Sequence, residues 1–322
     1  MKPVPKSLMS TLATGLFFSL LLNVSTQAAT DGNSAGNYSS SLDAWRKHAD
    51  EKIRAEDGPL SAVGLYWLHD GVNKVGAYPS DEVVLSSNAA PVKAGIIKVV
   101  GSSVTFDAAD NVVVSVDGKD TTHVSLQKDG QLDQSTFKLG RLKFSFVNRE
   151  LGLAVRVTDP DSEARRDFPG QQWFPADESW IMEGHFVPFA APKTLVYEAA
   201  TGGTRTGISP GYVSFTRDGH EYRLEVQKAS GTGSGYIAFF FDGTTGKATY
   251  GGGRVVPIEQ LTGDNVKLDF NKAFNMPCAV SPFFNCQIAP QQNHLTALLI
   301  PAGEKKPLVK VQRVASAPEY IK

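Results

Sequence analysis

From Leu60 onward, five Asp-Gly pairs divide the chain, and they constrain its fold more than any other feature. They lie at residues 70–71, 117–118, 129–130, 218–219 and 242–243. Asp-Gly favours tight hairpins because glycine accepts a positive φ angle without steric cost. The runs between the pairs are rich in β-branched and aromatic residues, as at 112–116, 142–147, 154–157, 212–215, 222–226 and 236–241. The sequence therefore predicts an all-β protein, an antiparallel β-barrel or sandwich of ten or more strands.

One amphipathic helix is predicted in front of the strands. Four apolar residues recur at helical spacing, namely Leu42, Trp45, Ala49 and Ile53. Ser40 followed by Asp43 is typical of a helix N-terminus, and the Gly-Pro pair at 58–59 stops the pattern. We expect a helix over residues 41–56 that docks Trp45 on the body of the protein.

Residues 1–28 have the layout of a cleavable signal peptide. Lys2 and Lys6 precede an apolar run over residues 8–24, and small residues follow it. The run is ~17 residues long and interrupted by polar side chains, which is short for a membrane span of ~20 residues. The protein is therefore expected to be periplasmic or secreted, with no membrane span after the signal is removed.

The exported chain is nearly neutral. Loss of Lys2 and Lys6 leaves 30 of the 32 basic side chains against 33 acidic ones, a net charge of −3. This balance gives no electrostatic reason to expect nucleic acid as a partner. Hydrophobic residues make up 41% of the chain, enough to bury a sizeable core.

The expected domain organisation is simple. Residues 29–40 are small and polar and are expected to be a flexible lead-in. A single β-rich domain over 41–322 follows, although the charged stretch at 159–166 could divide it into two β halves. Its C-terminal part is expected to be a long, Pro-rich loop region held by Pro277, Pro282, Pro290 and Pro301, among others.

Residues 242–304 concentrate the side chains that could carry chemistry. The candidate ligand-binding residues are Tyr250, Arg254, Asp269, Asn271, Asn275, Asn293 and Glu304. Ordered loops also use Asn and Asp side chains to satisfy their own backbone groups. These residues could therefore pin the loop instead of binding a ligand. A second group at 168–180, rich in Trp and Phe, could line a pocket or pack in the core.

Cys278 and Cys286 are the only cysteines of the chain. In an exported protein two cysteines indicate one disulfide. The alternative is a pair of free thiols, in which Cys278 could act as a nucleophile.

No motif for a metal or cofactor is recognised, so none is expected. The six histidines lack the local spacing of a zinc site, and residues 243–247 lack the spacing of a P-loop. Residues 207–211 match the G-x-S-x-G pattern of hydrolases. The residue after the serine is Pro210, which has no N–H to stabilise an oxyanion, so this segment is interpreted as a turn.

Two stretches in the C-terminal third carry a resemblance to a known family. The first reads Asp269-Phe270-Asn271-x-Ala273-Phe274-Asn275-Met276-Pro277-Cys278-Ala279, and the second is Ala302-Gly303-Glu304. With the stretches at 64–76 and 242–254, they resemble a bacterial and archaeal family catalogued as domain of unknown function 1684. The resemblance extends over most of residues 45–304 and implies no known reaction.

Three functions follow as hypotheses. The first is a protein that binds a small molecule in a pocket lined by the 242–304 loops. The second is an enzyme, hydrolase-like, with Asp269 or Glu304 as acid or base, Arg254 stabilising an anion and Cys278 as nucleophile. The third is an interaction module of the cell envelope.

Overall fold

The computed structural model describes residues 28–127, 135–149, 152–200, 202–229, 235–261 and 265–309. The predicted signal peptide, apart from Ala28, lies outside these residues, and so does the Asp-Gly pair at 129–130. The chain divides into two compact units, Met1–Ser41 and Leu42–Lys322. All sheets and pockets described below belong to the second unit.

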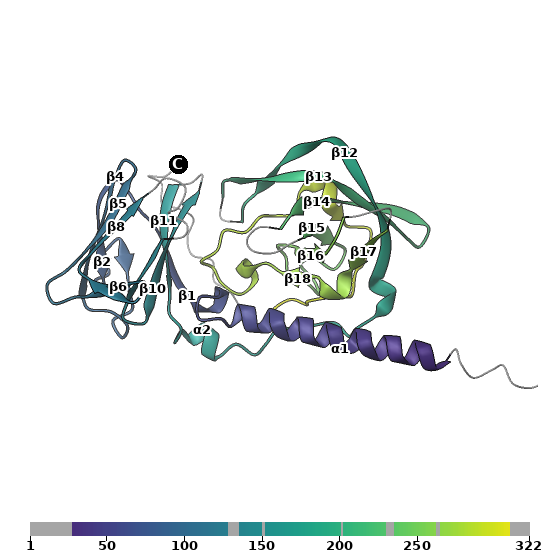
Figure 1. The fold of residues 1–322 in the computed structure, drawn as a ribbon, viewed down its shortest axis with the longest axis horizontal. Coiled ribbons are helices and arrows are strands. Elements are labelled where there is room, and N and C mark those ends of the chain that lie inside the picture. Colours follow the sequence, from purple (N-terminus) through teal and green to yellow (C-terminus); the bar gives the residue numbers. More distant parts are fainter. Residues whose placement is uncertain are drawn as a thin grey trace, which may run out of the picture. The chain divides into compact units, whose positions relative to one another are not determined.

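The first element is a single helix, α1, at Ala28–Ile53 (Figure 1). Its predicted apolar stripe is buried from Leu42 onward: Leu42 is 1% exposed, and Trp45 and Ala49 are half-buried. The centroid of the Trp45 ring lies 5.7 Å from that of Trp173 and 6.1 Å from that of Phe274. The predicted docking of Trp45 is therefore confirmed.

The helix begins earlier than predicted and includes residues 29–40, the segment that the sequence predicted as a lead-in. Ser40 lies inside the helix, where its Oγ donates to Gly36 O at 3.0 Å, and does not cap it. The reason is cooperativity, because extending a helix is easier than nucleating one. No proline interrupts the chain between Ala28 and Ile53.

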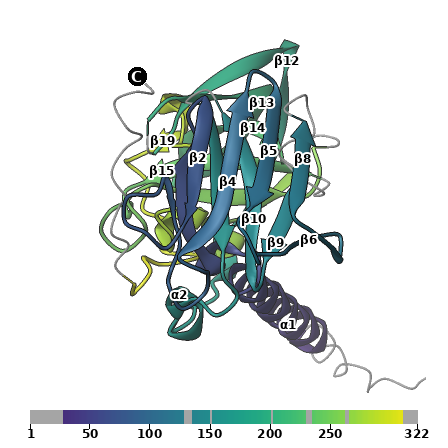
Figure 2. The same ribbon diagram turned by 90° about the vertical axis from the view of Figure 1, so that its left-hand side faces the viewer.

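The strands between Ala62 and Thr158 form two sheets, which we call the sandwich region. They are β1 (Ala62–Trp67), β2 (Gly71–Gly76), β3 (Val83–Val84), β4 (Lys93–Val100), β5 (Ser103–Ala108), β6 (Val114–Val116), β7 (Lys119–Thr121), β8 (His123–Gln127), β9 (Thr136–Leu139), β10 (Leu142–Arg149) and β11 (Gly152–Thr158). One sheet has the order β1-β11-β10-β9-β6-β7 and the other β3-β2-β4-β5-β8. Figure 2 shows β2, β4, β5 and β8 side by side. The pairing is antiparallel except between β2 and β3.

The sandwich region encloses one apolar core. Phe106 of β5 stacks on Phe137 of β9 with ring centroids 4.7 Å apart, and Phe137 stacks on Phe144 of β10 at 4.6 Å. These rings join the two sheets, because β5 belongs to one and β9 and β10 to the other. Burying each ring stabilises the fold by about 1.5–3 kcal/mol.

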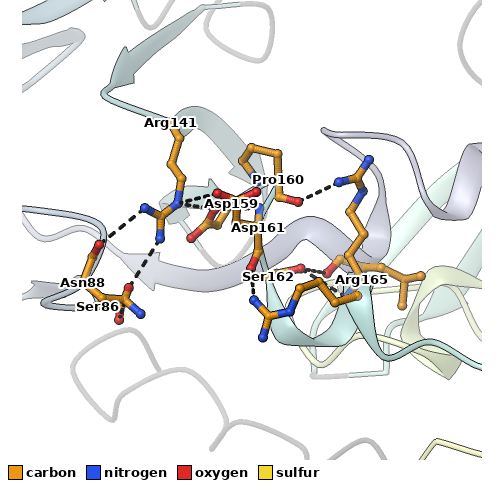
Figure 3. Close-up of polar contacts among 10 residues, drawn as sticks. Ser86, Asn88, Arg141, Asp159, Pro160, Asp161, Ser162 and Arg165 are labelled. Carbon is orange, nitrogen blue, oxygen red and sulfur yellow. Dashed lines mark hydrogen bonds and ion pairs between the residues drawn. The ribbon is translucent and has the colours of Figure 1, made fainter.

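The charged stretch at 159–166 is an ordered link that ends in a one-turn helix, α2 (Glu163–Arg166). Ser162 caps this helix by accepting a backbone N–H at 3.2 Å. Before it, the Asp159 carboxylate accepts a hydrogen bond from Arg141 Nε at 2.8 Å (Figure 3). The charges that suggested a domain boundary therefore hold the link against the sandwich region.

A second β region follows, which we call the C-terminal region (residues 166–305). Its strands are β12 (Ile181–Glu198), β13 (Thr204–Arg217), β14 (His220–Lys228), β15 (Tyr236–Asp242), β16 (Arg254–Ile258), β17 (Val266–Asp269), β18 (Phe274–Asn275) and β19 (His294–Leu295). They form a half-barrel with the order β17-β12-β13-β14-β15-β16-β18, and β19 adds to β15 in parallel. Short 3₁₀ turns connect them at Glu178–Trp180, Phe270–Lys272, Pro277–Ala279 and Gln291–Asn293.

The C-terminal region has a core cluster of its own, centred on Phe270. The Phe270 ring is fully buried, with its centroid 5.5 Å from that of Phe240, 5.7 Å from that of Phe215 and 6.4 Å from that of Trp180. The apolar interior is thus divided between the two β regions. The single domain over 41–322 stays a prediction.

Two of the five Asp-Gly pairs form the predicted hairpins. In Asp117-Gly118 and Asp218-Gly219 both residues have positive φ, with values of 49° and 78° and of 51° and 77°. These pairs connect β6 to β7 and β13 to β14.

The hairpins predicted at 70–71 and 242–243 are wrong. The first joins β1 to β2, which lie in different sheets. The second opens a long connection over residues 243–253, so β15 pairs with β16 without a tight turn at 242–243. The G-x-S-x-G segment also differs from expectation, because residues 207–211 lie inside β13 and do not form a turn. In each case the tertiary context overrides the local turn signal.

The prediction of an all-β fold with one N-terminal helix and a loop-rich C-terminal part is confirmed, with α2 as a single added turn. Among the described helices, none is both long enough and apolar enough to cross a membrane.

Candidate functional site

Asp269 and Asn271 hold two segments of the C-terminal region together. Asp269 ends β17, and its Oδ1 accepts the backbone N–H of Asn271 at 3.1 Å. The Asn271 side chain pairs with the backbone of Asp177, donating from Nδ2 to Asp177 O at 2.9 Å and accepting Asp177 N–H at 3.0 Å. Asn271 is fully buried, so its amide serves the fold at this position.

Asn293 has a similar structural role. Its Oδ1 accepts Glu225 N–H at 2.8 Å, and its Nδ2 donates to Glu225 O at 2.9 Å and to Phe239 O at 2.8 Å. The side chain thereby fixes the loop before β19 to β14 and β15. Buried loop backbone needs such partners.

Arg254 and Asp242 form a buried ion pair. Arg254 is 1% exposed, and its Nη2 lies 3.3 Å from Asp242 Oδ1. Its Nη atoms also donate to the carbonyl oxygens of Ile300, at 3.0 Å, and of Ala302. Burial lowers the pKa of Arg254, while the charge of Asp242 opposes this effect. The Nη groups are committed to the chain itself and hold residues 300–302 in place.

The Glu304 carboxyl is also buried, and it lies beside two amide side chains. Its Oε2 accepts Asn275 N–H at 2.7 Å, and the Gln171 side chain also hydrogen-bonds to it. Burial raises the pKa of Glu304 to about 7, although these hydrogen bonds and the charge of Arg254 act in the opposite direction. Glu304 therefore exchanges a proton near neutral pH.

Asn275 and Gln171 also line a pocket with a volume of about 360 Å³. We call it the Trp45 pocket. Helix α1 contributes Trp45, His48, Ala49, Lys52 and Ile53 to it. The body contributes Pro59, Gln171, Pro257, Phe274, Asn275 and Pro277. The walls are mostly apolar with a few polar groups, which is the usual composition of a ligand pocket.

Two residues that line the Trp45 pocket have acceptor oxygens without partners. Gln171 Oε1 and Asn275 Oδ1 are buried and accept no hydrogen bond from the described residues. Asn275 as a whole is only 5% exposed, and its Nδ2 donates to Lys305 O at 2.8 Å. A buried acceptor without a partner costs about 1–3 kcal/mol, so a donor supplied by a ligand would relieve that cost.

The basic side chains of the Trp45 pocket lie at its solvent side. His48 and Lys52 are exposed, one helical turn apart on α1. The pocket lining contains no acidic side chain. Among the described residues Lys52 makes no ion pair, whereas His48 Nδ1 lies 3.9 Å from Glu51 Oε2. The rim is therefore positive, with Lys52 as its available cation.

Cys278 and Cys286 form a disulfide, the first of the two predicted alternatives. Cys278 therefore carries no thiol that could act as a nucleophile. The disulfide borders a second pocket of about 110 Å³, which Tyr250 and Met276 also line. Tyr250 Oη donates to Cys278 O at 3.2 Å, so Tyr250 supports the disulfide loop.

The candidate residues thus lie at different places. Asn275 lines the Trp45 pocket, and Glu304 lies directly behind it. Tyr250, Cys278 and Cys286 line the smaller pocket. Arg254, Asp269, Asn271 and Asn293 bind the chain itself. Among the described residues, no group of three or more His, Cys, Asp or Glu side chains could hold a metal ion.

Sequence reasoning did not identify the helix as a wall of the site. Trp45 was expected only to dock α1, and Lys52 was not considered. Trp45, Ala49 and Lys52 are spaced by four and three residues, so they lie on one helix face. This spacing could have identified the face of α1 that lines the pocket. The facing residue Gln171 lay in the aromatic-rich stretch at 168–180, which was considered as a pocket wall.

Comparison with known proteins places the similarity in the C-terminal region. A family model described as "protein of unknown function (DUF1684)" matches residues 166–305. The solution NMR structure of an uncharacterized protein of Haloarcula marismortui is 30% identical, and the match covers 45% of this chain and 80% of that chain, with a TM-score of 0.38. No curated protein matches the chain.

The family match is narrower than the sequence predicted, because the resemblance was expected over most of residues 45–304. The upstream stretch at 64–76 lies in the sandwich region, outside the match. Two of its residues have local structural roles. Gly71 has a φ angle of +96°, and Asn73 closes the turn before β2 by accepting His69 N–H at 3.0 Å. Such residues satisfy the needs of a turn in many proteins.

Proposed function

The chain belongs to the DUF1684 family of proteins of unknown function, and on that premise we propose that it is an exported protein that binds a small organic molecule in the Trp45 pocket. The family segment supplies the inner wall of that pocket with Pro257, Phe274, Asn275 and Pro277. The predicted loops at 242–304 thus take part in the proposed site, together with α1.

One observation carries the proposal: a residue that lines an apolar pocket has a side-chain oxygen that is buried and has no partner. Asn275 Oδ1 is that oxygen. The volume of about 360 Å³ lies in the range of small-molecule sites. Proteins keep few unpaired buried polar groups, and each one calls for an explanation such as a ligand or an ordered water.

Export is supported by two features of the chain. Residues 1–28 have the pattern of a signal peptide, and the Cys278–Cys286 disulfide fits an oxidising compartment. We therefore propose that the protein acts in the periplasm or outside the cell. Detection of the processed chain in the periplasmic or secreted fraction, with a mass shortened by the signal, would test this. An unprocessed chain in the cytoplasm would contradict it.

The binding proposal is tested by a thermal-shift screen of small aromatic compounds, because a ligand of the native state stabilises it. A compound present at 100 times its Kd adds about 2.7 kcal/mol to the free energy of unfolding. The variant Ala49→Phe fills the pocket, whereas Ala44→Phe puts the same ring on an exposed position of the same helix. True ligands raise the melting temperature of the wild type and Ala44→Phe but not of Ala49→Phe. Equal shifts in both variants, or no active compound at all, would contradict the proposal.

A second candidate function, acid–base catalysis, rests on Glu304. A carboxyl with a pKa of about 7 is suited to proton transfer at neutral pH. Its carboxyl oxygen is hydrogen-bonded to Asn275 N–H, so a substrate would reach it only if the wall at Gln171 or Asn275 moved. If a compound from the screen is converted to product, Glu304→Gln should abolish the conversion while binding persists. Unchanged turnover in that variant would remove Glu304 from the chemistry.

A further inference from the structure

We infer that the Trp45 pocket selects one chemical class, a ring-bearing organic acid that carries a hydrogen-bond donor at the end opposite its anionic group. The inference rests on the proposed function, because it assigns the ligand of that same site. It follows from three features of the pocket: the nature of its walls, the unpaired acceptors on its buried side and the charge at its rim.

The walls favour a flat apolar body. Trp45 and Phe274 supply aromatic rings with centroids 6.1 Å apart, and Ile53 adds an aliphatic side chain. An engineered apolar cavity of about 150 Å³ accommodates benzene. The volume of about 360 Å³ therefore has room for one ring with substituents at both ends.

The buried side of the pocket requires a donor. Asn275 Nδ2 donates to Lys305 O, so the orientation of its amide is set by the hydrogen-bond network and its Oδ1 is the acceptor. The Gln171 side chain hydrogen-bonds to the Glu304 carboxyl group and thereby lowers the pKa of Glu304, so its Nε2 is the donor there and its Oε1 is left as an acceptor too. Neither oxygen has a partner among the described residues. A ligand hydroxyl would satisfy one of them, whereas a ligand carbonyl or ether would leave both unpaired.

The solvent side of the pocket favours an anion. Lys52 and His48 are exposed at the rim, and no acidic residue lines the pocket. On the same helix, the Glu51 carboxylate lies 3.9 Å from both Lys47 Nζ and His48 Nδ1. Lys52 is left to attract a ligand carboxylate. The ligand is therefore expected to place its hydrogen-bond donor at the buried side of the pocket and its anionic group at the solvent side.

Four simple compounds separate these features when binding to the purified protein is measured by calorimetry. They are 4-hydroxybenzoate, benzoate, 4-hydroxybenzyl alcohol and tyramine. We expect 4-hydroxybenzoate to bind most tightly. Benzoate, which lacks the hydroxyl, should bind about tenfold more weakly. The neutral alcohol should bind about threefold more weakly, and the cationic tyramine at least tenfold more weakly.

Two variants assign the preferences to residues. Lys52→Gln should remove the advantage of 4-hydroxybenzoate over the alcohol, while Lys47→Gln, an exposed change on the same helix outside the pocket, should keep it. Gln171→Met should reduce the advantage of 4-hydroxybenzoate over benzoate. Lys52 is exposed, so its variant folds normally and keeps the inference testable if Gln171→Met is unstable.

The outcomes distinguish the inference from the function on which it rests. Tyramine binding as tightly as 4-hydroxybenzoate, or an unchanged acid preference in Lys52→Gln, would overturn the inference. So would pocket ligands from the thermal-shift screen that lack both a donor and an anionic group, although the proposed function would then stand. If no compound in either experiment distinguishes Ala49→Phe from the wild type, both fail.

Discussion

The sandwich region and the C-terminal region bury different types of side chain. In the sandwich region, the buried side chains that the structure describes are apolar apart from Asn73 and Thr158. The C-terminal region buries many polar and charged groups, including Arg254, Asp242 and Glu304. Each of these bonds to backbone groups of the loops around residues 275 and 300.

This difference indicates which of the two regions contains the candidate functional site. Apolar packing such as the Phe106–Phe137 stack maximises stability and leaves no group for chemistry. A buried polar network costs desolvation and is retained where loops must hold a defined conformation. In this protein the network ends at Asn275, in the wall of the Trp45 pocket. The family match covers the polar region and not the apolar one.

The largest expected effect comes from Arg254→Met. The change leaves the Asp242 carboxylate buried without its cation, and breaking a buried pair in this way costs about 3–5 kcal/mol. The measurement is the free energy of unfolding in urea. Arg223→Met is the matched control, because its ion pair with Glu221 is exposed and should contribute at most about 1 kcal/mol.

A double variant sharpens the first prediction. Replacing Asp242 by Leu together with Arg254→Met removes both charges, so part of the lost stability should return. If Arg254→Met lowered the free energy of unfolding by less than the Arg223→Met control does, the C-terminal region would not depend on its polar network. The comparison between the two regions would then break down.

The sequence predicted the parts of the fold that local interactions decide. Strands with alternating side chains, the hairpins at 117–118 and 218–219, the helix stripe from Leu42 and the disulfide all depend on residues close together in the chain. The hairpin predicted at 242–243 failed because the Asp242 carboxylate accepts Ile300 N–H from 58 residues away. No local pattern encodes such a contact.

The site was predicted only in part for the same reason. Asn275 and Glu304 were identified as candidates because their residue types are unusual in a loop. Their neighbours in space, Gln171 and Lys52, come from segments more than 100 residues away in sequence. The pocket exists only once α1 has docked, and spacing along one segment cannot show which distant segment faces it.

The next effect is a dependence of stability on pH. Between the ordinary carboxyl pKa of 4.5 and about 7, the folded protein keeps a proton on Glu304 that the unfolded chain releases. The contribution of Glu304 to the free energy of unfolding is therefore complete below pH 4.5. It decreases by on the order of 3 kcal/mol as the pH rises toward 7. Glu304→Gln stays neutral and lacks this fall, so its stability relative to wild type should rise from pH 4.5 to 7 and then level off.

Denaturation of the wild type and of Glu304→Gln in urea at a series of pH values measures this difference. The other carboxylates titrate in both proteins and cancel. A constant difference across pH 4.5 to 7 would show that Glu304 titrates normally and that its burial has no electrostatic cost. The sandwich region has no counterpart among its described residues, since it buries no carboxylate.

Loss of the disulfide should have a somewhat smaller effect. The bond between Cys278 and Cys286 closes a loop of nine residues, and the chain-entropy relation gives about 2.5 kcal/mol. The double variant Cys278→Ser with Cys286→Ser should lose this stability. Because the loop contributes Pro277 to the Trp45 pocket, ligand-induced shifts in melting temperature should also shrink. An unchanged ligand response would separate the loop from the site.

The smallest effect offers a matched test across the two regions. Gly118 in the sandwich region and Gly219 in the C-terminal region have φ angles of 78° and 77°, and a Cβ added at either one would contact nothing within 4 Å. Alanine at each position therefore incurs only the left-handed backbone cost, about 1–2 kcal/mol. Since the local chemistry is the same, Gly118→Ala and Gly219→Ala should lower the unfolding free energy equally if the chain unfolds as one cooperative unit. If instead each variant shifts a separate transition, the two β regions are independent in stability, and the polar network must then hold the C-terminal region without support from the apolar sandwich.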